Sequence, residues 1–340
     1  MNNTENINYP APKQEYKVLV RCFTYNQSKY IEDTLNGFAM QQTDFPFICL
    51  VMDDASTDGE QDVIKAWMEG ECDMDKAEII DIPTSVVIIV QHKINPSCTL
   101  AFYLLKQNLY NAKEKKMAHV APWREKCEYE AMCEGDDYWI APLKLQKQVN
   151  VMDANQRIGL CYTRAKIFNQ RLNIFDSNFG GKAFGGLRQI LCENPIVTLT
   201  AMYKTKFANK YLNEVNPYIK SWKMGDYPLW LFIYEYQDIC FLDDITGVYR
   251  KLPESASHSN DINKKLSFLD SYYEIQCFFG ERYQISYFAQ LWIKFRYYFT
   301  KAKLYVSHKM ICESVRCLIL LPFLFVLGYF GYVQLRNNNK

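Results

Sequence analysis

The stretch Met132-Cys133-Glu134-Gly135-Asp136-Asp137-Tyr138-Trp139 is the most informative part of this chain. Three of the four positions from 134 to 137 carry carboxylates, and they directly follow an apolar run. Unpaired carboxylates at this density repel one another. A hard divalent cation with oxygen ligands, shared with a diphosphate, makes the arrangement favourable. The stretch therefore indicates a metal and phosphate site, and it favours a nucleotide-dependent transferase.

Short apolar runs that are typical of buried strands recur before this stretch. Residues 16–23, 47–52, 84–90 and 129–133 are predicted strands, and the last of them ends at the acidic stretch. Between the strands, the spacing of apolar residues predicts three helices: residues 31–42, a helix that buries Val63, Ile64 and Trp67, and residues 99–112. Alternation of this kind predicts an α/β fold with a right-handed, mostly parallel sheet flanked by helices.

Polar side chains at the ends of three predicted strands gather at one edge of this sheet. Ligands of open sheets bind beyond the carboxyl ends of the parallel strands. Tyr25, Asp53, Asp54 and residues 134–137 all fall there. Structural alternatives exist for each: the two aspartates can cap the next helix, the acidic cluster can be a solvated turn, and Tyr25 can be a packed aromatic side chain.

The pattern is weaker beyond the acidic stretch. A helix that starts after Pro142 is predicted to pack on the far side of the cluster, and residues 158–163 and 195–203 are predicted strands. The glycine-rich residues 180–186 are predicted to form a loop. Asp226 is a second acidic signal, with the structural alternative that it simply opens a helix.

From Ile262 onward the pattern is helical, aromatic and basic, with seven Lys or Arg against two acids from Glu281 to Arg316. An anionic membrane surface attracts such a region. Residues 317–335 follow without a charge, and at about 1.5 Å per residue they just reach across a bilayer core of roughly 30 Å. Pro322 and two glycines weaken that span. The tail therefore predicts membrane attachment, and whether it spans or lies on the bilayer stays open.

Composition excludes several classes of protein. With 340 residues and 49% hydrophobic content, the chain can bury a substantial core. A net charge of +1 provides no field that draws in nucleic acid. Twelve cysteines without a CxxC pair indicate neither a zinc site nor a disulfide framework. The N-terminus lacks a secretory signal, so we expect the cytoplasmic face of the cell membrane.

Four motifs occur together and in order: Tyr25-Asn26, Asp53-Asp54-Ala55-Ser56-Thr57-Asp58, Glu134-Gly135-Asp136-Asp137-Tyr138-Trp139 and Gly225-Asp226-Tyr227-Pro228. This set resembles the family 2 glycosyltransferases with the GT-A fold, of the bacterial surface-polysaccharide type. The resemblance covers about residues 16–258. It implies a polar leader over residues 1–15, a GT-A domain over residues 16–260, and a helical extension over residues 261–340 with the apolar segment at 317–335.

The resemblance also implies a donor site. Tyr25 and Asp54 would contact the base and ribose of a nucleoside diphosphate-sugar, for which a UDP-sugar is favoured, and Asp53 would support the same loop. Arg250, with residues 255–258, resembles the segment that folds over the diphosphate.

Asp136 matches the metal-ligating carboxylate of the family, which implies Mg²⁺ or Mn²⁺ as cofactor. Glu134 stands where an Asp is usual, so it would reach the ribose or the metal through water, and Asp137 lies beside them. Asp226 matches the base that removes the acceptor's proton in inverting members, and Gly225 stands where the family usually has an acid.

The implied activity is metal-dependent, inverting transfer of a sugar to a hydroxyl of a saccharide or lipid-linked acceptor. One alternative is a noncatalytic sugar-nucleotide-binding assembly protein, which Gly225 and Glu134 favour. A nucleotidyltransferase is the other. Residues 21–31 contain no glycine for the loop that holds a triphosphate, which argues against it.

Overall fold

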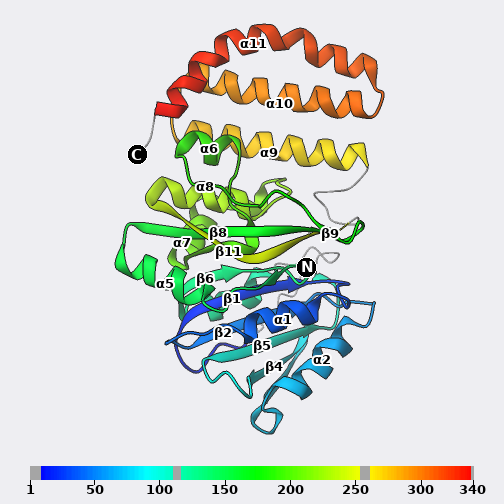
Figure 1. The fold of residues 1–340 in the computed structure, drawn as a ribbon, viewed down its shortest axis with the longest axis vertical. Coiled ribbons are helices and arrows are strands. Elements are labelled where there is room, and N and C mark those ends of the chain that lie inside the picture. The colour runs from blue at the N-terminus through cyan, green and yellow to red at the C-terminus, as the bar shows by residue number, and fades with distance from the viewer. Residues whose placement is uncertain (1–8, 110–115, 253–260, 338–340) are drawn as a thin grey trace, which may run out of the picture.

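A computed structural model describes residues 9–109, 116–252 and 261–337 of the chain. Its centre is an eleven-stranded sheet with the order β3-β4-β5-β2-β1-β6-β10-β8-β11-β7, and β9 pairs with β8 (Figure 1). The strands are β1 (Tyr16–Thr24), β2 (Phe47–Asp53), β3 (Glu78–Ile82), β4 (Ser85–Gln91), β5 (Cys98–Leu105), β6 (Cys127–Met132), β7 (Tyr138–Trp139), β8 (Ile158–Asn169), β9 (Ile174–Phe175), β10 (Met202–Lys204) and β11 (Asp238–Lys251).

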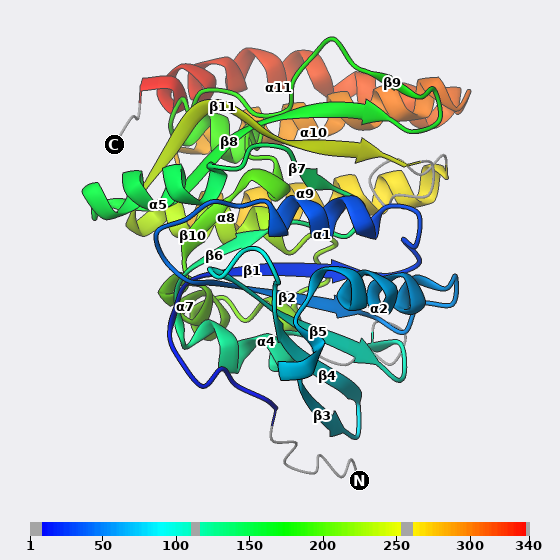
Figure 2. The ribbon, with the colours of Figure 1, turned by 60° about the horizontal axis from the view of Figure 1, so that its bottom comes forward.

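Helices cover both faces of the sheet (Figure 2). One face of β1 and β2 packs on α1, α2 and α5, and the other face packs on α4. The α-helices are α1 (Ile31–Ala39), α2 (Glu60–Glu71), α4 (Met117–Arg124), α5 (Lys144–Ala154), α6 (Leu187–Cys192), α7 (Lys206–Glu214), α8 (Asp226–Tyr236), α9 (Ile262–Arg282), α10 (Tyr287–Ser307) and α11 (Ile311–Asn337). Short 3-10 turns lie at η1 (Met74–Lys76), η2 (Thr198–Thr200) and η3 (Pro217–Ile219).

The parallel sheet predicted from the sequence is the middle of this mixed α/β structure. Strands β5, β2, β1 and β6 are parallel neighbours, as are β8 and β11. Antiparallel pairings join β3 to β4, β4 to β5, β6 to β10, β10 to β8 and β11 to β7. The carboxyl ends of β1, β2 and β6 therefore meet at one edge, as the sequence predicts.

The helix predicted over residues 99–112 is wrong, because its first half is strand β5. All eight residues of β5 are buried, since it lies between β2 and β4 with a helical layer on each face. A short, continuous apolar run has neither the period of a helix nor that of a half-buried strand. The spacing of its apolar residues therefore does not distinguish a buried strand from a helix. Residues 110–112 of this prediction lie outside the described part of the chain.

Two smaller differences concern the other strands. Residues 195–203 are predicted as one strand, but only the three residues of β10 pair with the sheet, after the 3-10 turn η2. Strand β3 was not predicted; it forms a hairpin with β4 across Pro83 and Thr84.

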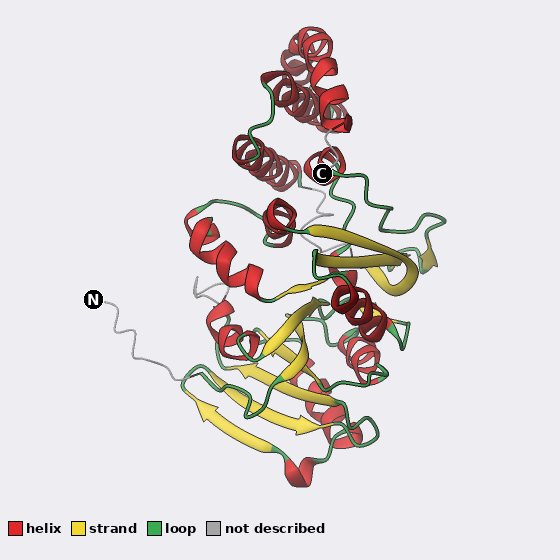
Figure 3. Ribbon diagram, turned by 90° about the vertical axis from the view of Figure 1, so that its left-hand side faces the viewer, coloured by secondary structure: helices red, strands yellow, loops and turns green. Residues whose placement is uncertain are grey.

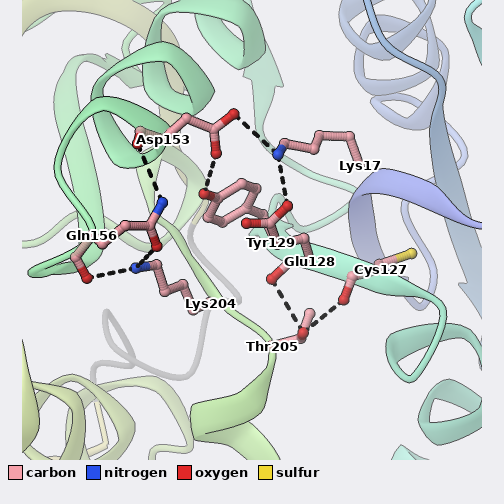
Figure 4. A network of polar contacts seen from close by, with 8 residues as sticks. All are labelled: Lys17, Cys127, Glu128, Tyr129, Asp153, Gln156, Lys204 and Thr205. Carbon is pink, nitrogen blue, oxygen red and sulfur yellow. Dashed lines mark hydrogen bonds and ion pairs between the residues drawn. The ribbon is translucent and has the colours of Figure 1, made fainter.

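A polar network fastens the amino ends of the parallel strands, opposite the acidic edge (Figure 4). Lys17 on β1 pairs with Glu128 on β6 at 2.6 Å and with Asp153 on α5 at 3.0 Å. The Asp153 carboxylate also accepts a hydrogen bond of 2.6 Å from the Tyr129 hydroxyl. These contacts hold β1, β6 and α5 in register and leave the carboxyl ends of the strands to the site.

Helices α9, α10 and α11 stack beyond the last strands (Figure 3). Ile275 and Phe279 of α9 belong to the same buried cluster as Trp230 of α8, so the extension shares a core with the sheet region. Helices α10 and α11 are antiparallel and very close: a Cβ on Gly331 would lie 2.1 Å from the carbonyl carbon of Phe288.

The outer side of α11 remains apolar and exposed. Ile319 is 71% exposed and Phe323 is 65% exposed. Within the described residues, α11 is the one helix long and apolar enough to cross a membrane, over Ile311–Arg336. Several further α11 side chains are exposed: Ile311, Val315, Leu318, Leu320, Phe325, Val326, Tyr329, Phe330 and Val333.

Candidate active site

The acidic loop, residues 134–137, follows β6 and is fixed by contacts with β1 and α1. The Thr34 hydroxyl donates to the backbone carbonyls of Gly135 at 3.0 Å and Asp137 at 2.6 Å. A Cβ on Gly135 would lie 2.1 Å from the Thr24 hydroxyl oxygen, so the loop can approach β1 this closely only with glycine there. The loop is therefore held rigidly beside the end of β1.

The loops after β1 and β2 also contact each other. The backbone N–H of Asn26 donates to the Ser56 hydroxyl, and the Asn26 side chain accepts from the backbone N–H of Thr57, both at 2.8 Å. Asp58 accepts from the backbone N–H of Ser28 at 3.0 Å. The three strand-end motifs predicted to converge do so.

Asp53 and Asp54 are buried and engaged within the protein. One oxygen of Asp53 accepts from the Ser56 backbone and from the Gln61 side chain, at 3.0 and 2.6 Å. Asp54 accepts from the backbone N–H of Leu109 at 2.7 Å and pairs with Lys116 at 2.6 Å. In this structure both carboxylates shape their loop, so the donor contact predicted for Asp54 requires Lys116 to move or to share it.

Tyr25 is 42% exposed at the edge of the sheet and lies beside these loops. Exposure of a large aromatic side chain next to a cluster of acids suits stacking on a flat ligand better than packing in a core. The alternative of a packed aromatic side chain is therefore not what the structure has.

Arg250 holds the acidic loop from β11. Its backbone N–H donates to the Asp137 carboxylate at 2.8 Å, and its guanidinium donates to the Asp136 carbonyl at 2.8 Å and pairs with Asp33. The guanidinium also lies over the ring of Tyr138, 4.3 Å from its centroid. Arg250 is only 6% exposed, so its first role is to position the loop. Residues 255–258, predicted to cover the diphosphate with it, lie outside the described residues.

A cavity of about 920 Å³ brings four of the eight predicted site residues together. Its wall includes Glu134, Asp136 and Asp137 from the acidic loop and Asp226 from the start of α8. The Thr198 hydroxyl donates to one oxygen of Asp226, and the backbone N–H of Tyr227 donates to the other at 2.7 Å. Tyr25, Asp53, Asp54 and Arg250 do not line this cavity.

The acids of the cavity influence one another. Burial raises the pKa of Glu134 to about 7; the charges of Asp136 and Asp226 add to the rise, and Arg21 opposes it. Burial likewise raises the pKa of Asp137 well above its usual range, and the charge of Asp136 strengthens this effect. A cation would therefore be favoured directly beside these acids.

No group of three or more His, Cys, Asp or Glu side chains in the described parts of the chain is arranged to hold a metal ion. Asp136 offers carboxylate oxygens, and burial raises its pKa while Arg250 lowers it. This donor set fits a hard cation only if the ligand brings further oxygen atoms, as a diphosphate does.

A buried ion cluster on the cavity wall was missed at the sequence level. Glu130 on β6 accepts from Arg21 on β1 at 2.7 Å and from Arg124 on α4 at 2.6 Å. Burial would raise the pKa of Glu130, but Arg124 and Arg21 outweigh it and hold the pKa at about 2. The available signal was one charged residue in each of two apolar strands, Arg21 in β1 and Glu130 in β6. The parallel register of the two strands brings these residues together.

Comparison with known proteins gives partial likenesses. No protein-family model matches the chain. The uncharacterized proteins Mb1547 of Mycobacterium bovis and Rv1520 of Mycobacterium tuberculosis H37Rv are 31% identical over 144 residues, which cover 42% of this chain and 34% of each relative. The match therefore extends over about a third of the length of these curated relatives.

Two solved structures have a similar chain path. The crystal structure of S. aureus TarS 1-349 is 16% identical, with 94% of this chain and 90% of that chain covered and a TM-score of 0.45. The mannosyltransferase PcManGT from Pyrobaculum calidifontis, in complex with GDP-Man and Mn2+, is 13% identical, with 98% and 89% covered and a TM-score of 0.48. These likenesses concern the arrangement of the chain.

Proposed function

We propose that this protein is a glycosyltransferase that moves a sugar from a nucleoside diphosphate-sugar, with a UDP-sugar favoured, to a hydroxyl acceptor. One observation carries the proposal: acids from two distant segments, Glu134 to Asp137 and Asp226, line one cavity at the carboxyl edge of the sheet. Ligands of α/β sheets bind at this edge. The ordered motifs that resemble family 2 glycosyltransferases support the same activity.

The donor would bind where the loops after β1 and β2 meet the acidic loop. Tyr25 would stack on the base, and Asp54, supported by Asp53, would accept from the ribose hydroxyls once Lys116 releases it. Arg250 would position the acidic loop, and its guanidinium would contact phosphate only by leaving Asp33. Glu134 and Asp137 would line the donor side of the cavity.

Asp136 would hold Mg²⁺ or Mn²⁺ together with oxygens of the donor diphosphate. When bound, this cation supplies positive charge at the leaving diphosphate. The protein's own contribution is to keep the Asp136 carboxylate in place, which it does through the Thr34 and Arg250 contacts to the backbone of the acidic loop.

Asp226 would act as the base. Two donors, the Thr198 hydroxyl and the Tyr227 N–H, orient its carboxylate at the start of α8. An oxygen of Asp226 would accept the acceptor's hydroxyl proton as the acceptor oxygen forms a bond to the anomeric carbon and the diphosphate departs. A single displacement of this kind inverts the anomeric centre.

We further propose that residues 16–260 form the catalytic unit and that residues 261–340 attach it to the cytoplasmic face of the cell membrane. The exposed apolar side of α11 supports this attachment, and so does the excess of basic residues from Glu281 to Arg316. A membrane location makes a saccharide or lipid-linked acceptor of surface-polysaccharide synthesis the preferred acceptor.

A noncatalytic sugar-nucleotide-binding protein is the second candidate. The pairing of Asp54 with Lys116 favours it, since that ion pair occupies a predicted donor contact, and so do Gly225 and Glu134. Donor hydrolysis separates the candidates, because a transferase with a bound donor transfers slowly to water.

The test is incubation of the full-length protein with Mn²⁺ or Mg²⁺ and a panel of nucleotide-sugars. We expect slow release of nucleoside diphosphate from one donor, and loss of that release in D136N. D243N is the matched control, because it removes an exposed carboxylate that pairs only with Arg164 among the described residues. Release from no donor would favour the binding protein, and release of pyrophosphate would indicate a nucleotidyltransferase.

A further inference from the structure

The arginine cluster, formed by Arg21, Glu130 and Arg124, lies in the wall of the same cavity as the acids. The three residues come from β1, β6 and α4, which are neighbours in Figure 2. Glu130 is completely buried, Arg124 is 2% exposed and Arg21 is 8% exposed. Both arginines line the cavity, together with Asp226. The cluster is therefore part of the cavity wall rather than of a separate buried core.

The positive charge of the cluster exceeds its negative charge. Glu130 is one carboxylate between two guanidiniums, which are always charged in proteins. Each arginine pairs with it through Nε, and Nη1 of Arg124 is buried without a hydrogen-bond partner among the described residues. Buried polar groups almost always have partners, and an unpaired donor on a buried cation is costly. Within the cluster itself, two guanidiniums therefore share one carboxylate.

The guanidinium groups are held in place before any ligand arrives. The Arg21 guanidinium lies over the Phe23 ring, 4.7 Å from its centroid, and Glu130 fixes the Nε edge of both arginines. Nη1 of Arg124 remains a donor without a partner among the described residues, and the planar fork of a guanidinium matches the oxygens of a phosphate or carboxylate. Rigid donors of this kind bind an anion with little loss of side-chain entropy.

We propose that the arginine cluster binds an anionic group, a phosphate or a carboxylate, carried by the acceptor. The proposal rests on the proposed function, because it assigns the cavity to the two substrates of a transferase. The acceptor is the better source because Asp226, the proposed base, lines the same cavity, whereas Asp53 and Asp54 of the nucleotide loops do not. The acceptor is thus a phosphorylated or acidic saccharide, or a lipid phosphate.

The diphosphate of the donor is the other source of the same chemistry. It would lie at Asp136, which lines the same cavity as the two arginines. The experiment below distinguishes the two sources, because nucleoside diphosphate can be supplied alone.

The first test is titration of inorganic phosphate into the full-length protein, followed by calorimetry and by the thermal midpoint at constant ionic strength. We expect saturable binding with a dissociation constant on the order of millimolar. R124Q removes the excess charge and leaves Arg21 paired with Glu130, and it should weaken phosphate binding at least about tenfold. R282Q is the control, because Arg282 also pairs with two glutamates, Glu214 and Glu235, but lies outside the cavity.

Should R124Q fail to fold by circular dichroism, R21Q carries the same prediction, since it leaves Arg124 paired with Glu130. If the wild type shows no saturable binding of phosphate or acetate, or if R124Q binds phosphate as well as R282Q does, the proposal is overturned.

The second test repeats the titration with saturating UDP and Mn²⁺. The acceptor assignment predicts that phosphate still binds and that R124Q binds UDP as tightly as the wild type does. If UDP abolishes phosphate binding and R124Q loses affinity for UDP, the arginines hold the donor diphosphate and the acceptor assignment is wrong. Phosphate binding with no donor hydrolysis in the nucleotide-sugar panel would refute the proposed activity and leave the anion site in place.

Discussion

The proposed chemistry depends on single carboxylates, and the contacts of each carboxylate indicate which role it has. Asp137 is tied to the Arg250 backbone, Asp54 is paired with Lys116, and Asp226 keeps two small donors while it faces the cavity. These surroundings support the proposal that Asp226 is the base.

Replacing Asp226 with Asn should lower sugar transfer by about 10²-fold to 10⁴-fold, because the amide cannot accept the proton. Donor binding should change less than about twofold, since the base acts on the acceptor. Transfer is measured as nucleoside diphosphate release in the presence of a membrane lipid extract, and donor binding by calorimetry. Normal transfer by D226N would show that another group is the base.

The burial of His119 predicts that the free energy of unfolding decreases in acid. It is buried between Tyr9 and Tyr103, one ring nitrogen lies 3.3 Å from the Thr84 hydroxyl, and burial lowers its pKa to about 4. The unfolded chain, with a pKa near 6.5, therefore takes up a proton first as the pH falls. The contribution of His119 is complete above pH 6.5 and declines as the pH falls to about 4, by about 1.4 kcal/mol per pH unit.

In H119F, the free energy of unfolding should fall less steeply between pH 6.5 and pH 4 than it does in the wild type. Urea denaturation at closely spaced pH values between 4 and 7 gives the free energy of unfolding of both proteins. An equally steep fall in the variant would assign the acid sensitivity to other groups.

At the scale of elements, strand ends were more predictable than strand partners. The ends of β1, β2 and β6 carry acids directly after apolar runs, a local signal, and the structure brings them together as predicted. Strand β5 was mistaken for a helix because burial on both faces removes any period from its sequence. The pairing of Arg21 with Glu130 depends on the register between β1 and β6, and that of Asp54 with Lys116 on a distant segment. Local spacing encodes neither.

Helix α11 carries the predicted membrane contact, and its exposed side chains allow a test in the intact chain. I319E with F323E places two charges on the exposed side and should reduce sedimentation with phosphatidylglycerol vesicles at least about tenfold, because each buried apolar side chain contributes about 2 kcal/mol. I79E with I94E is the control, since both are exposed apolar residues far from α11, at 64% and 82%. Equal sedimentation of the two variants and the wild type would exclude α11 as the anchor.

At the scale of the whole molecule, one mixed sheet serves two purposes. Its carboxyl edge gathers the acidic loop and the loops after β1 and β2. Helix α8 packs on its last strands, and α9 packs on α8 and is followed by the hairpin of α10 and α11 (Figure 1). The cavity lies between these parts, with Asp136 on the sheet side, Asp226 at the start of α8 and Phe268 from α9. A membrane-bound acceptor would thus meet the donor at the boundary between sheet and extension.

Calorimetric titration of UDP and GDP into the wild type and D136N, each with and without Mn²⁺, tests the central claim most directly. The wild type should bind one of the two nucleotides at least about tenfold more tightly with Mn²⁺ than without it, because cation and diphosphate occupy the site together. D136N should lose that difference. Binding of neither nucleotide, or an equal effect of Mn²⁺ in both proteins, would contradict a donor site built on Asp136.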